Sequence, residues 1–159
     1  MVASERHFTD AQNHYLTGKS FVRSAKLITS HPECKGSIEV ATNMSVSLLL
    51  GFAMELYLKS WLIDMGHDKE LKSPKIAHNL NSLLDLTYEN GLHHMNDIDL
   101  VVKFLNENHS DYSNRYMKRG TYKQVPFKVI ENVFAIMDVI WTARLRLPPP
   151  PRPSDGEIA

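Results

Sequence analysis

Residues 44–63 read MSVSLLLGFAMELYLKSWLI and form the longest apolar stretch of the chain. A helix built from them carries apolar side chains on nearly every side, which is typical of a helix at the centre of a bundle or against a second subunit. The stretch is also nearly long enough to cross a bilayer. It contains Glu55 and Lys59, however, and charged side chains at the centre of a bilayer are costly. We therefore predict the central helix of a soluble core over residues 39–65 and disfavour a transmembrane span.

Helical periodicity predicts four more helices around this one. Apolar residues recur at spacings of three and four over residues 4–29, 78–89 and 96–106, and again from Pro126 onward. Turn-forming residues such as Gly66 separate these segments. Since no stretch alternates as a half-buried strand would, the prediction is one all-α bundle of about five helices over residues 1–147.

The last residues of the chain differ from the rest. Residues 148–151 are four consecutive prolines, which cannot continue a helix. We expect residues 148–159 to form an extended, disordered proline-rich tail. A ligand for a proline-binding module is the alternative to a simple solvated terminus, which we favour.

Composition limits the classes of partner. Among 159 residues, 18 basic side chains balance 18 acidic ones, so any binding to nucleic acid or an anionic membrane needs a local patch. The chain has one cysteine, Cys34, which excludes an intrachain disulfide and fits a reducing compartment. The first ten residues lack the apolar core of a signal peptide. We expect a cytoplasmic protein that does not associate with membranes.

Glu55 and Lys59 are the first candidate site residues. They lie four positions apart, so both point from one side of the central helix. A carboxylate in such an apolar setting needs a partner or takes up a proton. We favour an ion pair within the core, and the alternative is a pair of polar groups in an interhelical cleft.

Motifs for metal or cofactor chemistry are missing from the sequence. Eight histidines are present, but no HExxH pattern and no CxxC pair accompanies them. The chain also lacks a glycine-rich phosphate loop, a nucleophile elbow and a kinase signature. We therefore expect no metal and no cofactor.

Residues 111–119, DYSNRYMKR, interleave tyrosines with cations. Cations attract phosphates and tyrosines stack on bases, so the segment suits a single-stranded nucleic acid. In the alternative, Arg115 and Tyr116 fold back onto the bundle and pair with Glu55 or Asp111. The two interpretations stay open, and the candidate binding residues here are Arg115, Tyr116, Lys118 and Arg119.

Two segments resemble the HEPN family of helical bundles. Residues 53–60, AMELYLKS, are similar to that family's A-x-E-x-x-L-K central helix, and residues 78–84, HNLNSLL, are similar to its H-x-L-x-x-L helix. The pair Arg115-Tyr116 also resembles an arginine–tyrosine pair that precedes the last helix in many members. The resemblance covers residues 40–145 and adds His78 to the candidate binding residues.

This resemblance implies an up-and-down bundle, often a homodimer, in prokaryotic defence, toxin–antitoxin or nucleotide-related systems. Many members are ribonucleases in which an arginine is followed, after four to six residues, by a histidine. No arginine of this chain has that relation to a histidine, and His109 precedes Arg115 in the reverse order. The catalytic pair is therefore not carried over, and the resemblance favours a protein without enzymatic activity.

Three functions remain as hypotheses. The first is a HEPN-like homodimer that binds RNA, another nucleic acid, a nucleotide or a partner protein. The second is a metal-independent ribonuclease that uses His109 and Arg115, because histidine can move protons near neutral pH and arginine can stabilise phosphate charge. The third is a dimerisation scaffold without a ligand.

Overall fold

A computed structural model describes residues 7–36, 39–109 and 126–147, and within these ranges the protein is entirely helical apart from turns. Five α-helices are present there: α1 (Asp10–Ser30), α2 (Glu39–Asp64), α3 (Leu80–Glu89), α4 (Asn96–His109) and α5 (Phe127–Leu145). Two short 3₁₀ helices, η1 (Pro32–Cys34) and η3 (Glu70–Lys72), lie in the connections. The predicted all-α bundle is confirmed, while the proline-rich tail at 148–159 lies outside the described residues.

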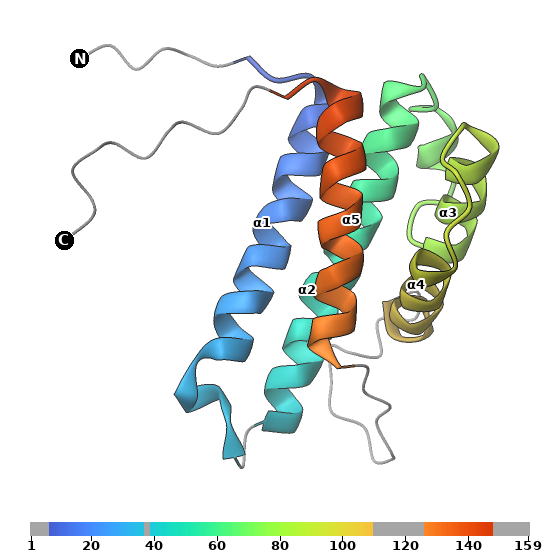
Figure 1. The fold of residues 1–159 in the computed structure, drawn as a ribbon. Helices are drawn as coiled ribbons and strands as arrows, with labels where there is room; N and C mark the ends of the chain where they lie inside the picture. Colours follow the sequence, from blue (N-terminus) through green and yellow to red (C-terminus); the bar gives the residue numbers. More distant parts are fainter. Residues whose placement is uncertain (1–6, 37–38, 110–125, 148–159) are drawn as a thin grey trace, which may run out of the picture.

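The three long helices form the body of the bundle. In Figure 1, α1 and α5 lie along α2, and the chain runs down α1 and then up α2, with α5 running in the direction of α2. The shorter α3 and α4 pack together on the other side of α2. The core contains residues from all five helices, and its largest fully buried side chains include Tyr15, Tyr57, Phe134 and Trp141.

Helix α2 is the central element that its sequence predicts. By length and composition, residues Ala41–Asp64 are apolar enough to cross a membrane, but the core helix of a soluble protein passes the same test. Within the bundle, 61% of its most apolar 18-residue window is buried. The packing therefore accounts for the apolar stretch without a bilayer.

Helix α1 begins at Asp10, so the predicted start at Ser4 was too early. The Thr9 hydroxyl accepts a hydrogen bond from the Gln12 backbone N–H at 3.2 Å, and the Thr9 N–H donates to Gln12 Oε1 at 3.0 Å. This reciprocal arrangement satisfies backbone N–H groups that have no partner at the start of a helix. It therefore fixes the first residue of α1 at Asp10. Apolar spacing alone did not distinguish the helix from the residues before its cap.

The boundaries of α3 and α4 also differ from the prediction. Helix α3 begins at Leu80 instead of His78, because the Asn79 side chain accepts from the Ser82 N–H at 3.1 Å and caps the first turn. Helix α4 continues to His109, beyond its predicted end at Asn106. The additional turn carries His109 into the core, where the residue as a whole is 2% exposed.

Polar contacts attach α1 and α5 to α2. The Trp141 Nε1–H lies 2.8 Å from the Tyr57 carbonyl oxygen and 2.9 Å from Ser60 Oγ. Tyr15 and Tyr57 donate their hydroxyl hydrogens to one oxygen of Asp138, at 2.7 Å and 2.6 Å. These bonds satisfy polar groups inside the apolar core and so set the positions of the three long helices.

A close approach of α1 to α2 depends on Gly18. A Cβ at this position would lie 2.8 Å from Tyr57 Cδ2 and 3.1 Å from the Ala53 carbonyl oxygen. The first distance is too short for a real contact, and the neighbouring backbone oxygen cannot easily give way. The missing side chain therefore lets α1 pack directly against Tyr57 and the backbone of Ala53.

We expect Gly18→Ala to lower the free energy of unfolding. Overpacking destabilises by about 1–3 kcal/mol, whereas the better helix propensity of alanine stabilises by at most about 1 kcal/mol. A net loss of about 1 kcal/mol in the free energy of unfolding should therefore appear in urea denaturation. Ser24→Ala, at an exposed position of the same helix, is the matched control and should be neutral or stabilising. If Gly18→Ala is as stable as this control, the close approach at Gly18 is not a constraint.

Candidate functional site

Three basic side chains contact the Glu55 carboxylate on the side of α2 that faces α3 and α4. Its Oε1 lies 2.6 Å from Lys59 Nζ, one helical turn further along. Its Oε2 lies 3.2 Å from His78 Nδ1 and 2.7 Å from His109 Nε2. We call these four residues the Glu55 cluster. The structure thus brings His78 and His109, which lie in other parts of the sequence, to Glu55 and Lys59 of the central helix.

His109 is the innermost member of the Glu55 cluster. Its side chain is 1% exposed and its ring meets the Phe52 ring edge-on, with centroids 5.2 Å apart. A Cβ on residue 51 would lie 2.7 Å from His109 Nδ1, so Gly51 provides the space that the ring occupies. Nδ1 has no hydrogen-bond partner among the described residues. The buried ring therefore donates through Nε2–H to the Glu55 carboxylate.

His78 and Lys59 lie nearer the surface. The His78 side chain is 51% exposed, whereas that of Lys59 is 15% exposed. His78 directly precedes the Asn79 cap of α3, and the next backbone N–H, that of Leu80, donates to Asn106 Oδ1 at 2.7 Å. This bond joins the start of α3 to α4 and sets the place from which His78 reaches Glu55.

Glu55 is a charged group inside the protein. Burial alone would raise the pKa of its carboxyl group, but hydrogen bonds from His109, Lys59 and His78, together with the positive charge of Lys59, lower that pKa to about 2. The carboxylate is therefore ionised at neutral pH, with both oxygens engaged. A group with such a low pKa is a poor general base, so this geometry is that of an ion cluster that joins helices.

Sequence reasoning identified Glu55 and Lys59 by their spacing, and the ion pair between them is present. It placed His109 in the segment before the last helix and missed its burial. One signal was available, because His109 continues the row of Val101 and Leu105 at intervals of four, on the buried side of α4. Arg115, Tyr116, Lys118 and Arg119 lie outside the described residues, so their pairing is untested.

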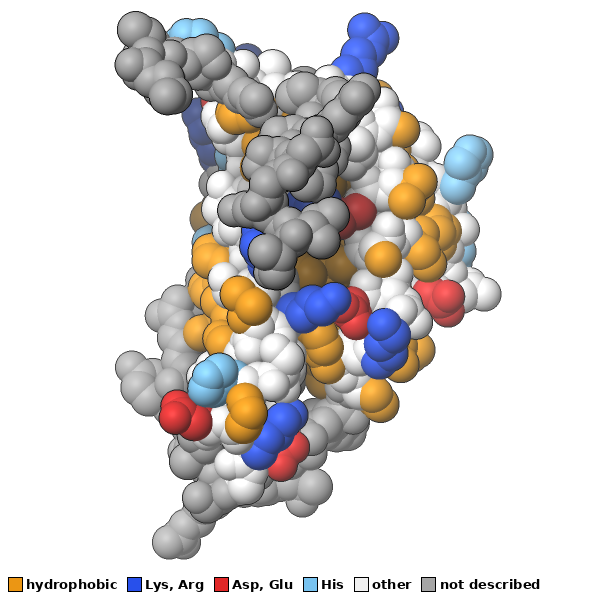
Figure 2. Space-filling model, turned by 60° about the vertical axis from the view of Figure 1, so that its left-hand side comes forward, with side chains coloured by type: hydrophobic (Ala, Val, Ile, Leu, Met, Phe, Trp, Pro, Cys, Tyr) orange, Lys and Arg blue, Asp and Glu red, His pale blue; other side chains and the backbone are white. Residues whose placement is uncertain are grey.

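Charges of both signs are mixed on one face of the molecule. On the face in Figure 2, basic and acidic side chains lie beside one another among hydrophobic ones, and none gather into a patch of one sign. Salt bridges between α1 and α5 follow the same pattern, with Lys19 Nζ 3.1 Å from Asp138 Oδ2 and Lys26 Nζ 2.6 Å from Glu131 Oε1. The part of the chain that the structure describes also contains no group of three or more His, Cys, Asp or Glu side chains suited to a metal ion.

The Glu55 cluster makes stability depend on pH. The folded-state pKa of Glu55 is about 2, below its ordinary value of 4.5, so the stabilisation is complete above about pH 4.5 and is lost as pH falls toward about 2. At neutral pH we expect Glu55→Gln to lower the free energy of unfolding by about 3 kcal/mol. The difference between wild type and variant should shrink below about pH 4.5.

Guanidinium denaturation followed by circular dichroism at several pH values measures this difference. Glu107→Gln, which removes an exposed carboxylate of α4, is the control and should change stability little at any pH. A Glu55→Gln penalty that stays constant down to about pH 3 would contradict an ionised, cation-paired Glu55.

Comparison of the chain with protein-family models, with curated proteins and with solved structures yields no match. The resemblance to HEPN bundles therefore rests on the short sequence motifs around Glu55 and His78 and on the Arg115-Tyr116 pair.

Proposed function

We propose that this chain is a HEPN-like bundle that binds single-stranded nucleic acid without cleaving it, as a cytoplasmic homodimer in a prokaryotic defence or toxin–antitoxin system. The observation that carries this proposal is the burial of His109 against Glu55 at the end of α4. This contact holds His109 in place, and His109 is the residue that directly precedes the basic, tyrosine-rich segment 110–125.

The distribution of charge along the sequence supports a binding role for that segment. Residues 110–125 contain four basic residues and one acidic residue, which leaves 14 basic and 17 acidic residues in the rest of the chain. They also contain three tyrosines. The excess of basic over acidic residues in this segment, together with its aromatic rings, is the local composition that phosphates and bases require.

The Glu55 cluster argues against the ribonuclease alternative. A general acid or base must come within hydrogen-bond reach of a substrate proton. His109 Nε2 already donates to Glu55 at 2.7 Å, and the side chain is 1% exposed. Glu55, with a pKa of about 2, does not replace it as a base. A phosphate would reach neither group in this arrangement.

The first test is the affinity for a fluorescently labelled single-stranded RNA at several salt concentrations, measured by anisotropy. We expect Arg115→Ala combined with Lys118→Ala to weaken binding and to reduce the salt slope by about 1–2, since each phosphate contact contributes about 1. Lys72→Ala combined with Lys75→Ala removes two exposed cations elsewhere and is the matched control.

Equal affinity of the two double variants would refute the nucleic-acid interface. Preference for a mononucleotide over the RNA would redirect the proposal to nucleotide binding, and no binding to either would favour a protein partner or a scaffold. Cleavage of the RNA in a chelator that is lost in His109→Ala, with the fold retained, would favour the ribonuclease.

The outward side of α5 supports the homodimer. Val129, Ile136 and Val139 are 40%, 38% and 73% exposed, although they are apolar. The exposed positions from 129 to 143 on this helix carry no charge: Val129, Asn132, Ala135, Ile136, Val139, Thr142 and Ala143. Ile136 is the middle residue of α5. An antiparallel pair of α5 helices about a two-fold axis at Ile136 would place Val129 opposite Ala143 of the partner and cover both apolar sides.

We expect Val139→Glu to weaken self-association at least about tenfold, because the pairing would bury an uncompensated carboxylate. Sedimentation equilibrium of the full chain measures the dimer constant. Leu100→Glu, on α4, is the control, because Leu100 is an apolar side chain of comparable exposure at 61%. A monomeric wild type, or a dimer weakened only by Leu100→Glu, would rule out the α5 interface.

A further inference from the structure

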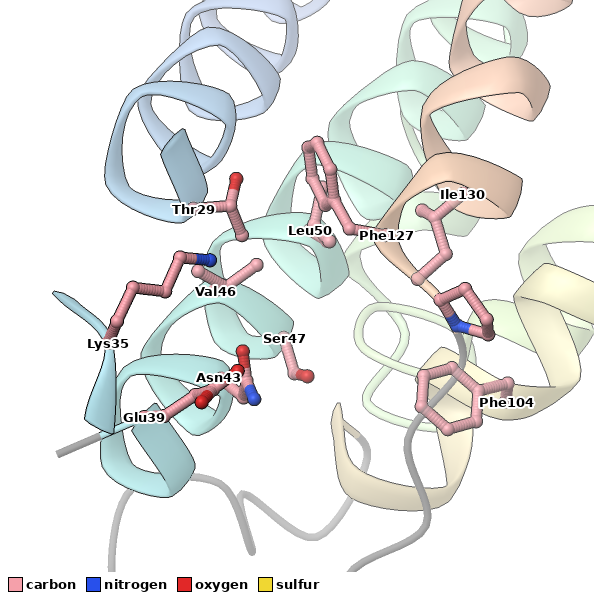
Figure 3. Close-up of a pocket in the computed structure, with 11 residues that line it drawn as sticks. Thr29, Lys35, Glu39, Asn43, Val46, Ser47, Leu50, Phe104, Phe127 and Ile130 are labelled. Carbon is pink, nitrogen blue, oxygen red and sulfur yellow. The ribbon is translucent and has the colours of Figure 1, made fainter. Parts of the chain in front are cut away.

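A second site candidate lies at the end of the bundle where α2 and α5 begin. A pocket of about 530 Å³ opens there between the end of α1, η1 and the first turns of α2, with α4 and α5 on the opposite side. Figure 3 shows Lys35 on one side of this pocket and Phe104 on the other, with Glu39, Asn43 and Ser47 between them. A volume of this size is within the usual range for small-molecule sites. The Glu55 cluster contributes no residue to it.

The Thr29 hydroxyl of this pocket is bonded within α1, donating to the Ala25 carbonyl oxygen at 2.7 Å, but four other polar side chains of the lining are not used by the fold. Glu39, Asn43 and Ser47 are spaced by four and form one row along α2. Neither these three side chains nor that of Lys35 forms a hydrogen bond or an ion pair with another described residue. Every charged member of the Glu55 cluster, by contrast, is paired inside the protein. The four groups are therefore free to bind a ligand in place of water.

The remaining wall is apolar. The half-buried rings of Phe104 and Phe127 come from α4 and α5, and the buried side chains of Val46, Leu50 and Ile130 also line the pocket. A ligand that fills this part must carry a hydrocarbon or aromatic group, because a polar group would lose its hydration there without gaining a partner. The pocket thus combines an apolar part with a polar rim.

The charges of the rim decide the class of ligand. The described lining contains one cation, Lys35, and one carboxylate, Glu39. A phosphate would meet the carboxylate as well as the cation, whereas a zwitterion satisfies both. We propose that this pocket binds a free α-amino acid with an apolar side chain, its carboxylate at Lys35, its ammonium at Glu39 and its side chain against Phe104 and Phe127. Asn43 and Ser47 hydrogen-bond to the polar end of the ligand.

Calorimetric titration of the full chain with three probes tests this assignment: L-phenylalanine, 3-phenylpropionate, which lacks the ammonium, and 2-phenylethylamine, which lacks the carboxylate. L-phenylalanine should bind most tightly. Lys35→Ala should weaken L-phenylalanine and 3-phenylpropionate about tenfold and leave 2-phenylethylamine unchanged. Glu39→Gln should have the converse effect and weaken only the two probes that carry an ammonium.

Matched controls are Lys75→Ala and Glu89→Gln, which remove exposed charges of the same kinds away from the pocket and should change no affinity. Ser47→Leu, which fills the pocket, should abolish binding of all three probes with the helical circular dichroism retained. The proposal is overturned if L-phenylalanine and L-leucine both fail to bind at about 10 mM, a concentration that detects even weak sites. It is also overturned if neither Lys35→Ala nor Glu39→Gln changes the affinity of any probe. Tighter binding of adenosine monophosphate than of L-phenylalanine in this pocket would overturn it as well.

Discussion

The burial of one carboxylate inside the bundle is the constraint on which the rest of the arrangement depends. Glu55 lies on the central helix and is 6% exposed, so its charge must be compensated by groups that the fold brings to it. Lys59 comes from the same helix, His78 from the start of α3 and His109 from the end of α4. The carboxylate thus determines how two separate helices lie against α2. Gly51, one turn before Glu55, completes the arrangement by leaving room for the His109 ring.

A second set of polar contacts, made by Tyr57, positions helices on the opposite side of α2. Tyr57 is two residues from Glu55 and therefore points about 200° away around the helix, toward α1 and α5. Its hydroxyl and that of Tyr15 share Asp138. Burial raises the pKa of both hydroxyls, so they stay protonated and donate to the carboxylate. The apolar core holds the bundle together, while these two polar clusters specify which helix lies on which side.

The pocket at the end of the bundle and the outward side of α5 contain no residue of these two clusters. Paired groups such as Glu55 and Asp138 are occupied by the fold, which suits them to positioning and not to recognition. Unpaired polar side chains occur instead at the end of the bundle where α2 and α5 begin, next to half-buried aromatic rings and buried aliphatic side chains. The exposed positions on the outward side of α5 are uncharged and belong to neither cluster.

The sequence by itself determined the all-α class, the five helices and the central place of residues 44–63, because these depend on the local period of apolar residues and on turn residues. It also determined the pairing of Glu55 with Lys59, since a spacing of four fixes two side chains on one side of a helix. Local pattern gave less precise helix boundaries, because caps such as Thr9 and Asn79 act through single hydrogen bonds.

Only the tertiary structure decided that His109 meets Glu55, 54 positions away along the chain, and that α4 extends to carry it there. It alone placed Phe104 and Phe127 across a pocket from Lys35. Contacts between helices depend on how whole elements pack, and many packings suit one apolar pattern. The physical reason that this packing is selected is the need to satisfy buried charges and hydroxyls, a requirement that no single segment of sequence reveals.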